Sequence, residues 1–354
     1  MTDLLALTAE LVDIPSVSHD EQAITDRIES DVRAVPWLTV DRVGNNVVAR
    51  TSLDRPMRVV IAGHTDTVPV NNNDRARVDG DTLWGLGASD MKGGLAVMLE
   101  LATTVATSAV DVTYAFYAGE EVASEHNGLG HLLRDRPDLL QGDVAILGEP
   151  TGAAIEAGCQ GTLRLAVTLK GARAHSARPW MGRNAIHRLG SLLAILDGWE
   201  GRRPIVDGCE FREALQAVMV EGGVAGNVVP DLARVVINHR FAPDRDETAA
   251  VAWVHELIAP VLEDGDTTEV VDSAAGARPG LDHPLIAALV ARNNVEVRAK
   301  LGWTDVARFS ALSMPALNLG PGDPLLAHTA DEHVSRDRLE RTWSILWDLI
   351  VNGA

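Results

Sequence analysis

The chain has 354 residues, with 50 acidic and 31 basic side chains and a formal net charge of −19. This length fits one large domain or two ordinary ones, and a hydrophobic content of 46% is enough for a folded core. Because there is no excess of basic residues, binding to nucleic acid or to an anionic membrane is excluded as the main function. The N-terminus lacks the basic region of a signal peptide, and no apolar stretch reaches the length of a membrane span. We therefore expect a cytoplasmic protein.

The first part of the chain alternates between expected helices and strands. Helical periodicity covers residues 3–13 and 20–35, with Ser18 as a candidate cap for the second helix. Further helices are expected over 94–107 and 129–136. Buried apolar runs typical of strands cover 58–63, 112–118, 143–147 and 315–319. This alternation predicts an α/β fold with a mainly parallel sheet flanked by helices.

The middle of the chain follows a different order of elements. Expected strands and helices alternate as β-α-β-β-α-β, over residues 162–169, 184–196, 218–221, 235–241, 248–262 and 268–271. That order is typical of a ferredoxin-like domain. We therefore expect an inserted domain over 162–272, and a discontinuous catalytic domain built from 1–161 and 273–354.

Most of the polar residues that can bind a metal follow expected strands, and Asp90 lies in a glycine-rich loop ahead of an expected helix. These polar residues are His64, Asp66, Asp90, Glu120, Glu121, Glu149 and His328. Because ligands in open α/β sheets bind beyond the carboxyl ends of strands, these side chains can converge on one edge. Imidazole nitrogen and carboxylate oxygen together suit zinc. The two histidines with three of these carboxylates are too many ligands for one tetrahedral ion, but they suit two ions if one carboxylate bridges them.

The motifs taken in order resemble those of the M20 family of di-zinc peptidases and deacylases. They are GHTDTVP, WGLGASDMKGG, AGEE, GEP and a late AH. The resemblance implies that one Zn²⁺ is bound by His64, Asp90 and Glu149. It implies that a second Zn²⁺ is bound by Asp90, Glu121 and His328, with Co²⁺ as a candidate substitute.

The same resemblance implies roles for two acidic residues that do not bind metal. Glu120 would be the general base, and the Asp66 carboxylate would orient His64 through a hydrogen bond. It also implies a cis peptide bond after Asp90.

Longer segments resemble the desuccinylase branch of that family, including AGCQGTLR, GGVAGNVVPD and NHRFAPDR. This implies hydrolysis of the succinyl amide of N-succinyl-LL-2,6-diaminopimelate, a small-molecule substrate of lysine and cell-wall precursor synthesis. Two alternatives stay open. One is another amide hydrolase of the same family, such as an acetylornithine deacetylase, an aminoacylase or a dipeptidase. The other is an inactive scaffold protein.

The resemblance also implies a homodimer that forms through the inserted domain. In that arrangement, His175 would reach the partner's active site and donate to the oxyanion. Contacts to the substrate are expected from Asn227, Arg240 and Thr304, with Arg178 as a further candidate, because arginine suits the recognition of carboxylates.

Overall fold

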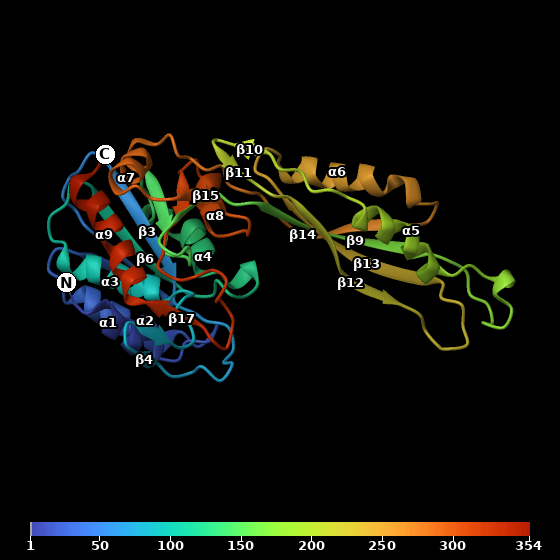
Figure 1. Ribbon diagram of the computed structural model, residues 1–354, viewed down its shortest axis with the longest axis horizontal. Coiled ribbons are helices and arrows are strands. Elements are labelled where there is room, and N and C mark those ends of the chain that lie inside the picture. The colour runs from blue at the N-terminus through green and yellow to red at the C-terminus, as the bar shows by residue number, and fades with distance from the viewer. Residues whose placement is uncertain (1) are drawn as a thin grey trace. The chain divides into compact units, whose positions relative to one another are not determined.

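The computed structural model describes residues 2–354 (Figure 1). The chain divides into two compact units, which are described separately. Unit 1 contains the residues up to Gly158 together with Pro279–Arg298 and Arg308–Ala354. Unit 2 contains Cys159–Arg278 and Ala299–Ala307. The segment 299–307, which the sequence analysis assigned to the catalytic domain, is thus grouped with the inserted part of the chain.

Unit 1 is built around an eight-stranded sheet in the order β1-β2-β6-β3-β7-β16-β8-β15. The strands are β1 (Thr39–Val43), β2 (Asn46–Arg50), β3 (Arg58–His64), β6 (Asp111–Tyr117), β7 (Val144–Leu147), β8 (Ile155–Ala157), β15 (Val297–Ala299) and β16 (Ala316–Asn318). The four central strands β6, β3, β7 and β16 are parallel, whereas β1 and β2 are added antiparallel. The central strands are almost fully buried, as expected for a parallel sheet covered on both faces. The prediction of an α/β fold is confirmed.

Helices cover this sheet, and the most buried of them is α3 (Lys92–Thr104). It packs on β3, and three further helices contact it in turn, namely α1 (Leu4–Val12), α2 (Gln22–Arg33) and α9 (Arg336–Asn352). Figure 1 shows α1, α3 and α9 side by side. The other helices are α4 (Gly128–Asp135), α7 (Pro284–Asn293) and α8 (Val306–Ala311), with 3₁₀ turns η1 (Ser124–His126) and η2 (Pro137–Leu139). None of the helices in residues 2–354 is long and apolar enough to cross a membrane.

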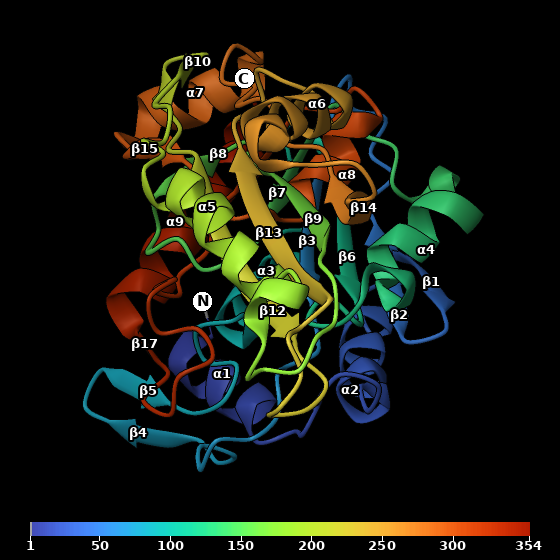
Figure 2. The same ribbon diagram turned by 90° about the vertical axis from the view of Figure 1, so that its right-hand side faces the viewer.

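A small antiparallel sheet lies beside the large one in unit 1. It consists of β17 (His333–Ser335), β5 (Thr82–Trp84) and β4 (Arg77–Asp79), and Figure 2 shows it at the lower left. Its pairing brings the chain after His328 next to the glycine-rich loop that follows β5. Residues far apart in sequence thus meet around Asp90.

Unit 2 has the ferredoxin-like order of elements that the sequence predicts. The elements are β9 (Gly161–Lys170), α5 (Ala185–Asp197), β12 (Ala214–Gly222), β13 (Leu232–Phe241), α6 (Glu247–Ile258) and β14 (Thr267–Ala274). The strands form an antiparallel sheet in the order β12-β13-β9-β14. Smaller elements are the hairpin of β10 (Ile205–Val206) and β11 (Cys209–Glu210), and the 3₁₀ turns η3 (Pro179–Met181) and η4 (Ala259–Val261).

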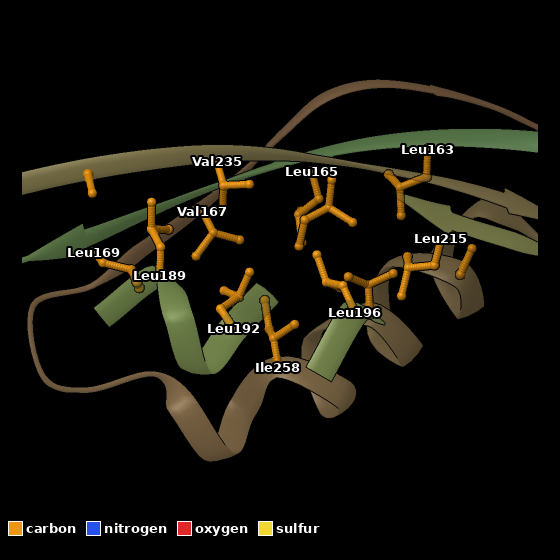
Figure 3. Close-up of a cluster of buried hydrophobic side chains, with 14 of the residues drawn as sticks. Leu163, Leu165, Val167, Leu169, Leu189, Leu192, Leu196, Leu215, Val235 and Ile258 are labelled. Atoms are coloured by element: carbon orange, nitrogen blue, oxygen red, sulfur yellow. The ribbon is translucent and has the colours of Figure 1, made fainter. Parts of the chain in front are cut away.

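The core of unit 2 lies between its sheet and its two helices. Figure 3 shows Leu163, Leu165 and Val167 of β9 pointing from the sheet toward the helices, where they meet Leu192 of α5 and Ile258 of α6. All five side chains are at most 1% exposed, so each contributes about 1.5–3 kcal/mol of burial free energy. Unit 2 therefore has an apolar core of its own.

Candidate metal centre

The parallel register of unit 1 brings the predicted metal ligands to one edge of the sheet. His64 is the last residue of β3 and pairs with Tyr117, the last residue of β6. On the other side, Ala62 of β3 pairs with Leu147, the last residue of β7. The acidic pair after β6 and the glutamate after β7 thus emerge beside His64. A side chain at Gly94 of α3 would overlap the carbonyl oxygen of Gly148, so this close approach of helix and strand end requires glycine.

His64 is completely buried, and its two ring nitrogens face different acceptors. Nδ1 lies 3.0 Å from the main-chain oxygen of Asp66, whereas Nε2 lies 3.1 Å from Oδ1 of Asp90. Because a carbonyl oxygen only accepts, Nδ1 carries the proton and donates it to this bond. Nε2 is then the nitrogen available to a metal. The family resemblance implies the Asp66 carboxylate in this role, but that group is farther from Nδ1, at 3.5 Å.

The electrostatic environment of His64 favours a cation. Burial opposes a charge on the ring, but the carboxylates of Asp66, Asp90 and Glu149 outweigh burial and raise the pKa of His64 well above its usual value. A site that stabilises a proton in this way also stabilises a metal cation at the same place.

The two carboxylate oxygens of Asp90 face two different histidines. Oδ1 faces His64, and Oδ2 lies 3.7 Å from Nε2 of His328. His328 is also 2.9 Å from Oε1 of Glu121. Ligand atoms of His64, Asp90 and Glu121 lie within 4.8 Å of one another. A carboxylate with a histidine at each oxygen suits a bridge between two ions, so the donor set fits a two-metal site. The peptide bond between Asp90 and Met91 is cis, as the resemblance implies.

The fifth predicted ligand, Glu149, lies just beyond the end of β7 and is only 6% exposed. Its negative charge is among the causes that raise the pKa of His64, which agrees with the strand register that places the two side by side. Glu149 is thus next to the histidine with which it is expected to share a metal ion.

The carboxylate of Asp66 holds the segment that carries the two predicted functional glutamates. Oδ1 accepts the N–H of Glu120 at 3.0 Å, and Oδ2 accepts the N–H of Glu121 at 3.1 Å. Oδ2 also accepts the hydroxyl of Ser18 at 2.7 Å. Burial opposes ionisation of Asp66, but His64 and these hydrogen bonds lower its pKa well below the usual range.

The prediction that Ser18 caps a helix is wrong, because the N-cap of α2 is Glu21.

A further carboxylate, which the sequence analysis did not single out, supports Asp90 from behind. Glu332 is 1% exposed, and its Oε1 accepts the main-chain N–H groups of Ser89 and Asp90, both at 2.9 Å. Its Oε2 accepts the N–H of Gly87 at 3.1 Å. Glu332 thus fixes the loop that presents Asp90. Its only cue in the sequence is its closeness to His328, which does not reveal contacts with main-chain groups.

The remaining predicted residues belong to unit 2, where they form two separate groups. His175 forms an isolated β-bridge with Val228, and the loops that carry His175, Arg178 and Asn227 meet at one end of the sheet. Figure 1 shows these two loops, between β9 and α5 and between β12 and β13.

Arg240 and Thr304 lie at the other end of that sheet. Arg240 pairs with Thr162 at the start of β9, and the carbonyl of Thr304 accepts a hydrogen bond from the Cys159 thiol at 3.8 Å. Nearly the whole ten-residue length of β13 separates Arg240 from the loops of His175, a distance of about 30 Å. The two groups therefore do not form one site within unit 2.

Comparison with known proteins places this site in a known family. Residues 60–352 match the model of "Peptidase family M20/M25/M40". The chain is 53% identical over 335 residues to a putative succinyl-diaminopimelate desuccinylase of Mycobacterium tuberculosis, covering 94% of this chain and 93% of that protein. It is 46% identical over 350 residues to a succinyl-diaminopimelate desuccinylase of Corynebacterium glutamicum, covering 97% and 95%.

Solved structures agree on the fold. A tripeptidase of Staphylococcus aureus matches with a TM-score of 0.80 at 20% identity, covering 98% of this chain and 97% of that one. A dinuclear metal-binding M20 peptidase of Bacillus subtilis matches with a TM-score of 0.73 at 15% identity, covering 98% and 96%. With its histidine and carboxylate cluster at the strand ends, the chain belongs to the M20 family of metal-dependent hydrolases.

Proposed function

We propose that the protein hydrolyses N-succinyl-LL-2,6-diaminopimelate to succinate and LL-2,6-diaminopimelate, a step in the synthesis of lysine and cell-wall precursors. The substrate is proposed from the similarity over nearly the full length to proteins named as desuccinylases. The reaction type rests on one observation. A histidine lies at each carboxylate oxygen of Asp90, and one of the two, His328, also contacts Glu121. This intact donor set argues against the inactive scaffold.

We propose that two Zn²⁺ ions occupy the centre. His64, Asp90 and Glu149 would hold one ion, and Asp90, Glu121 and His328 would hold the other. Nitrogen and oxygen donors without a thiolate suit Zn²⁺, and Co²⁺ accepts the same donors. When bound, the ions supply Lewis-acid activation of water and of the amide carbonyl.

In this proposal Glu120 moves the protons of the reaction. Its neighbour Glu121 is a metal ligand, and the main-chain N–H groups of both are fixed on the Asp66 carboxylate. Glu120 accepts a proton from the attacking water as the water oxygen bonds to the amide carbon. As the C–N bond breaks, Glu120 gives that proton to the leaving nitrogen, so it acts first as base and then as acid.

We propose that the active enzyme is a homodimer. His175, Asn227 and Arg178 lie about 30 Å from Arg240 and Thr304 along the sheet of unit 2, too far for one small substrate to touch both groups. In a dimer both groups can contribute to one site, if each copy supplies His175, Asn227 and Arg178 to the active site of the other copy. His175 would then donate a hydrogen bond to the oxyanion in that site. The edge strand β12 offers an unpaired edge for such contact, with Val218, Met219 and Val220 each more than half exposed.

We place the protein in the cytoplasm. Both of its cysteines, Cys159 and Cys209, are free and buried. Unpaired thiols are the rule in a reducing compartment.

The experiment that tests the proposed substrate compares two amides at equal metal loading. N-succinyl-LL-2,6-diaminopimelate and N-acetylornithine are each supplied to the purified protein, and kcat/KM is measured for both. We expect the succinylated substrate to be strongly preferred. A higher kcat/KM for N-acetylornithine would contradict the desuccinylase proposal while leaving the metal centre intact.

A further inference from the structure

A polar cavity lies in unit 1, next to the segments that follow Glu149 and precede His328. Its volume is about 610 Å³, within the range of sites for small organic molecules. Its walls come from four segments that are distant in sequence, around Thr151, Glu296, Asp323 and Arg338. None of the residues assigned to the metal centre lines it, so it is a separate compartment.

The cavity presents two guanidinium groups that no carboxylate neutralises. Arg338 and Arg341 are three residues apart on α9 and therefore share one face of the helix. Arg338 donates to the carbonyl of Gly152, and Arg341 donates to the carbonyl of Asn293. Within residues 2–354 neither arginine forms an ion pair with an acidic side chain. Each guanidinium has five N–H donors, so most of them stay available to a ligand.

The acidic side chains of the cavity have hydrogen-bond or ion-pair partners other than Arg338 and Arg341. Glu156 accepts from Nε of Arg298 at 3.0 Å, and Glu296 lies 3.8 Å from the same guanidinium, so these three form an ion-pair cluster. Asp323 accepts the N–H of Leu325 at 2.9 Å. The cavity wall thus carries three acidic and three basic side chains, and Arg338 and Arg341 are the two basic groups without an acidic partner among residues 2–354.

We propose that this cavity is an anion site that binds a small organic carboxylate through Arg338 and Arg341. Arg338 and Arg341 are exposed, and each is anchored by one main-chain carbonyl, so their remaining N–H groups can form charge-assisted hydrogen bonds with a carboxylate. Two guanidinium groups on one helix face suit a small dicarboxylate, because each can form a bidentate pair with one planar carboxylate.

The position of the cavity connects it to the metal centre. Thr151 follows Glu149 by two residues, and the carboxylate of Asp323 lies in the loop that leads to His328. The N–H of Asp323 donates to Oγ of Ser89 at 2.7 Å, and Ser89 directly precedes Asp90. A bound anion would therefore contact the same loops that position three of the proposed ligands.

The test measures binding of glutarate to the metal-loaded protein by calorimetry. We expect Arg338→Gln/Arg341→Gln to weaken glutarate binding about tenfold or more, because the charge-assisted bonds are lost. The matched control is Arg134→Gln/Arg136→Gln, which removes the same charge from exposed arginines beside Asp135 and Asp138. This control should bind glutarate as the unaltered protein does, and the thermal unfolding of both variants shows whether each is folded.

Two further experiments determine where the anion binds and which anion the site prefers. We expect His64→Ala, which damages the metal centre, to keep glutarate binding. Binding that is lost in His64→Ala but kept in Arg338→Gln/Arg341→Gln would place the anion at the metal centre and overturn the proposal. Inorganic phosphate is titrated in parallel, and stronger arginine-dependent binding of phosphate than of glutarate would overturn the carboxylate assignment. Absence of glutarate binding at millimolar concentration would also overturn it.

Discussion

Two buried carboxylates, Asp66 and Glu332, organise the metal centre through main-chain N–H groups. Asp66 fixes the glutamate pair after β6, and Glu332 fixes the loop before Asp90. Each presents an acceptor to N–H groups that would otherwise point into a buried region unpaired, which would cost free energy. The proposed metal ligands are thus held in place by residues that are not themselves proposed to bind metal.

The substitution Glu332→Gln tests this positioning role. A glutamine places an NH₂ group toward main-chain donors, so at least one of the three hydrogen bonds is lost and the Asp90 loop loosens. We expect metal affinity to fall about 10–100-fold, as is typical for groups that orient ligands. Metal titration measures this affinity, and Glu340→Gln, at an exposed position on α9, is the control. Unchanged metal affinity in Glu332→Gln would mean that the loop holds Asp90 without this carboxylate.

The substitution Glu120→Gln tests the proton-transfer role. A glutamine keeps the size of the side chain but cannot accept the proton of the attacking water. We expect kcat to fall by about 10²–10⁴-fold, with metal content unchanged. Steady-state kinetics and metal analysis on the same sample check both statements. If kcat stays within a few-fold of the original value while the metals are bound, Glu120 is not the base.

Whether a site residue can be predicted from the sequence depends on how far along the chain its contacts lie. His64 and Glu149 are marked by short motifs at strand ends, because the chain direction of a parallel sheet decides where they emerge, and Asp90 is marked by the glycine-rich loop before α3. Glu332 contacts the N–H of Asp90 across 242 residues of sequence, and its partners are main-chain groups that no residue pattern encodes. The preference of His64 for the carbonyl rather than the carboxylate of Asp66 likewise depends on local backbone geometry.

At the scale of elements, long buried segments were predictable and short or exposed ones were not. The four central strands and the order of unit 2 follow from apolar runs and periodicity. Strand β12 covers Ala214–Gly222, whereas only 218–221 was expected. Most of its side chains are exposed and show no alternation, so the sequence pattern does not mark its full length. Helix α6 ends at Ile258, before the expected 262, and is followed by the 3₁₀ turn Ala259–Val261, which contains Pro260. Three-residue strands such as β8 and β15 carry too few residues for a pattern.

His239 on β13 gives unit 2 a predictable dependence on pH. The ring is fully buried against Trp253, Phe241 and Trp199, with centroid distances of 4.6, 5.7 and 6.0 Å. Burial, opposed by Glu213 at 4.0 Å and helped by the nearby arginines Arg245 and Arg202, lowers the pKa of His239 to about 4. The ring is therefore neutral in the folded protein at pH values where the unfolded chain, with a histidine pKa of about 6.5, binds a proton.

We expect this histidine to make the protein less stable as the pH falls from about 6.5 to about 4. Its contribution is fully present above the unfolded pKa, and the loss across the window is up to about 3 kcal/mol. Denaturant unfolding at pH 7, 5.5 and 4.5 measures it in the original protein and in His239→Leu. The leucine variant should show a shallower decline over this window, whatever its stability at pH 7. Parallel declines would show that His239 does not cause the dependence.

For the whole molecule, the net charge of −19 constrains how an anionic substrate is bound. The proposed substrate carries three carboxylates and one ammonium group, and so has a charge of about −2 at neutral pH. The field of the whole protein opposes its approach, so attraction has to come from local positive charge. The metal centre and Arg240 are the proposed sources of that charge.

The dimer proposal predicts complementation between two inactive variants. In a mixture of Glu120→Gln and His175→Ala chains, a mixed dimer has one site with both defects and one site with neither. Random exchange of subunits makes about half of the dimers mixed, so about a quarter of the original activity should return. The mixture is assayed after subunit exchange, and each variant alone is the control. If no activity returns although sedimentation shows mixed dimers, His175 does not act in the partner's site.

The most direct test of metal-dependent desuccinylation is succinate release as metal is returned to chelator-stripped protein. Succinate formed from N-succinyl-LL-2,6-diaminopimelate is measured as Zn²⁺ is added in steps. We predict no release from the stripped protein, and full activity when two ions are bound per chain by the histidines and carboxylates around Asp90. Succinate release that persists in the stripped protein, or that does not return when Zn²⁺ is bound, would contradict the proposed function.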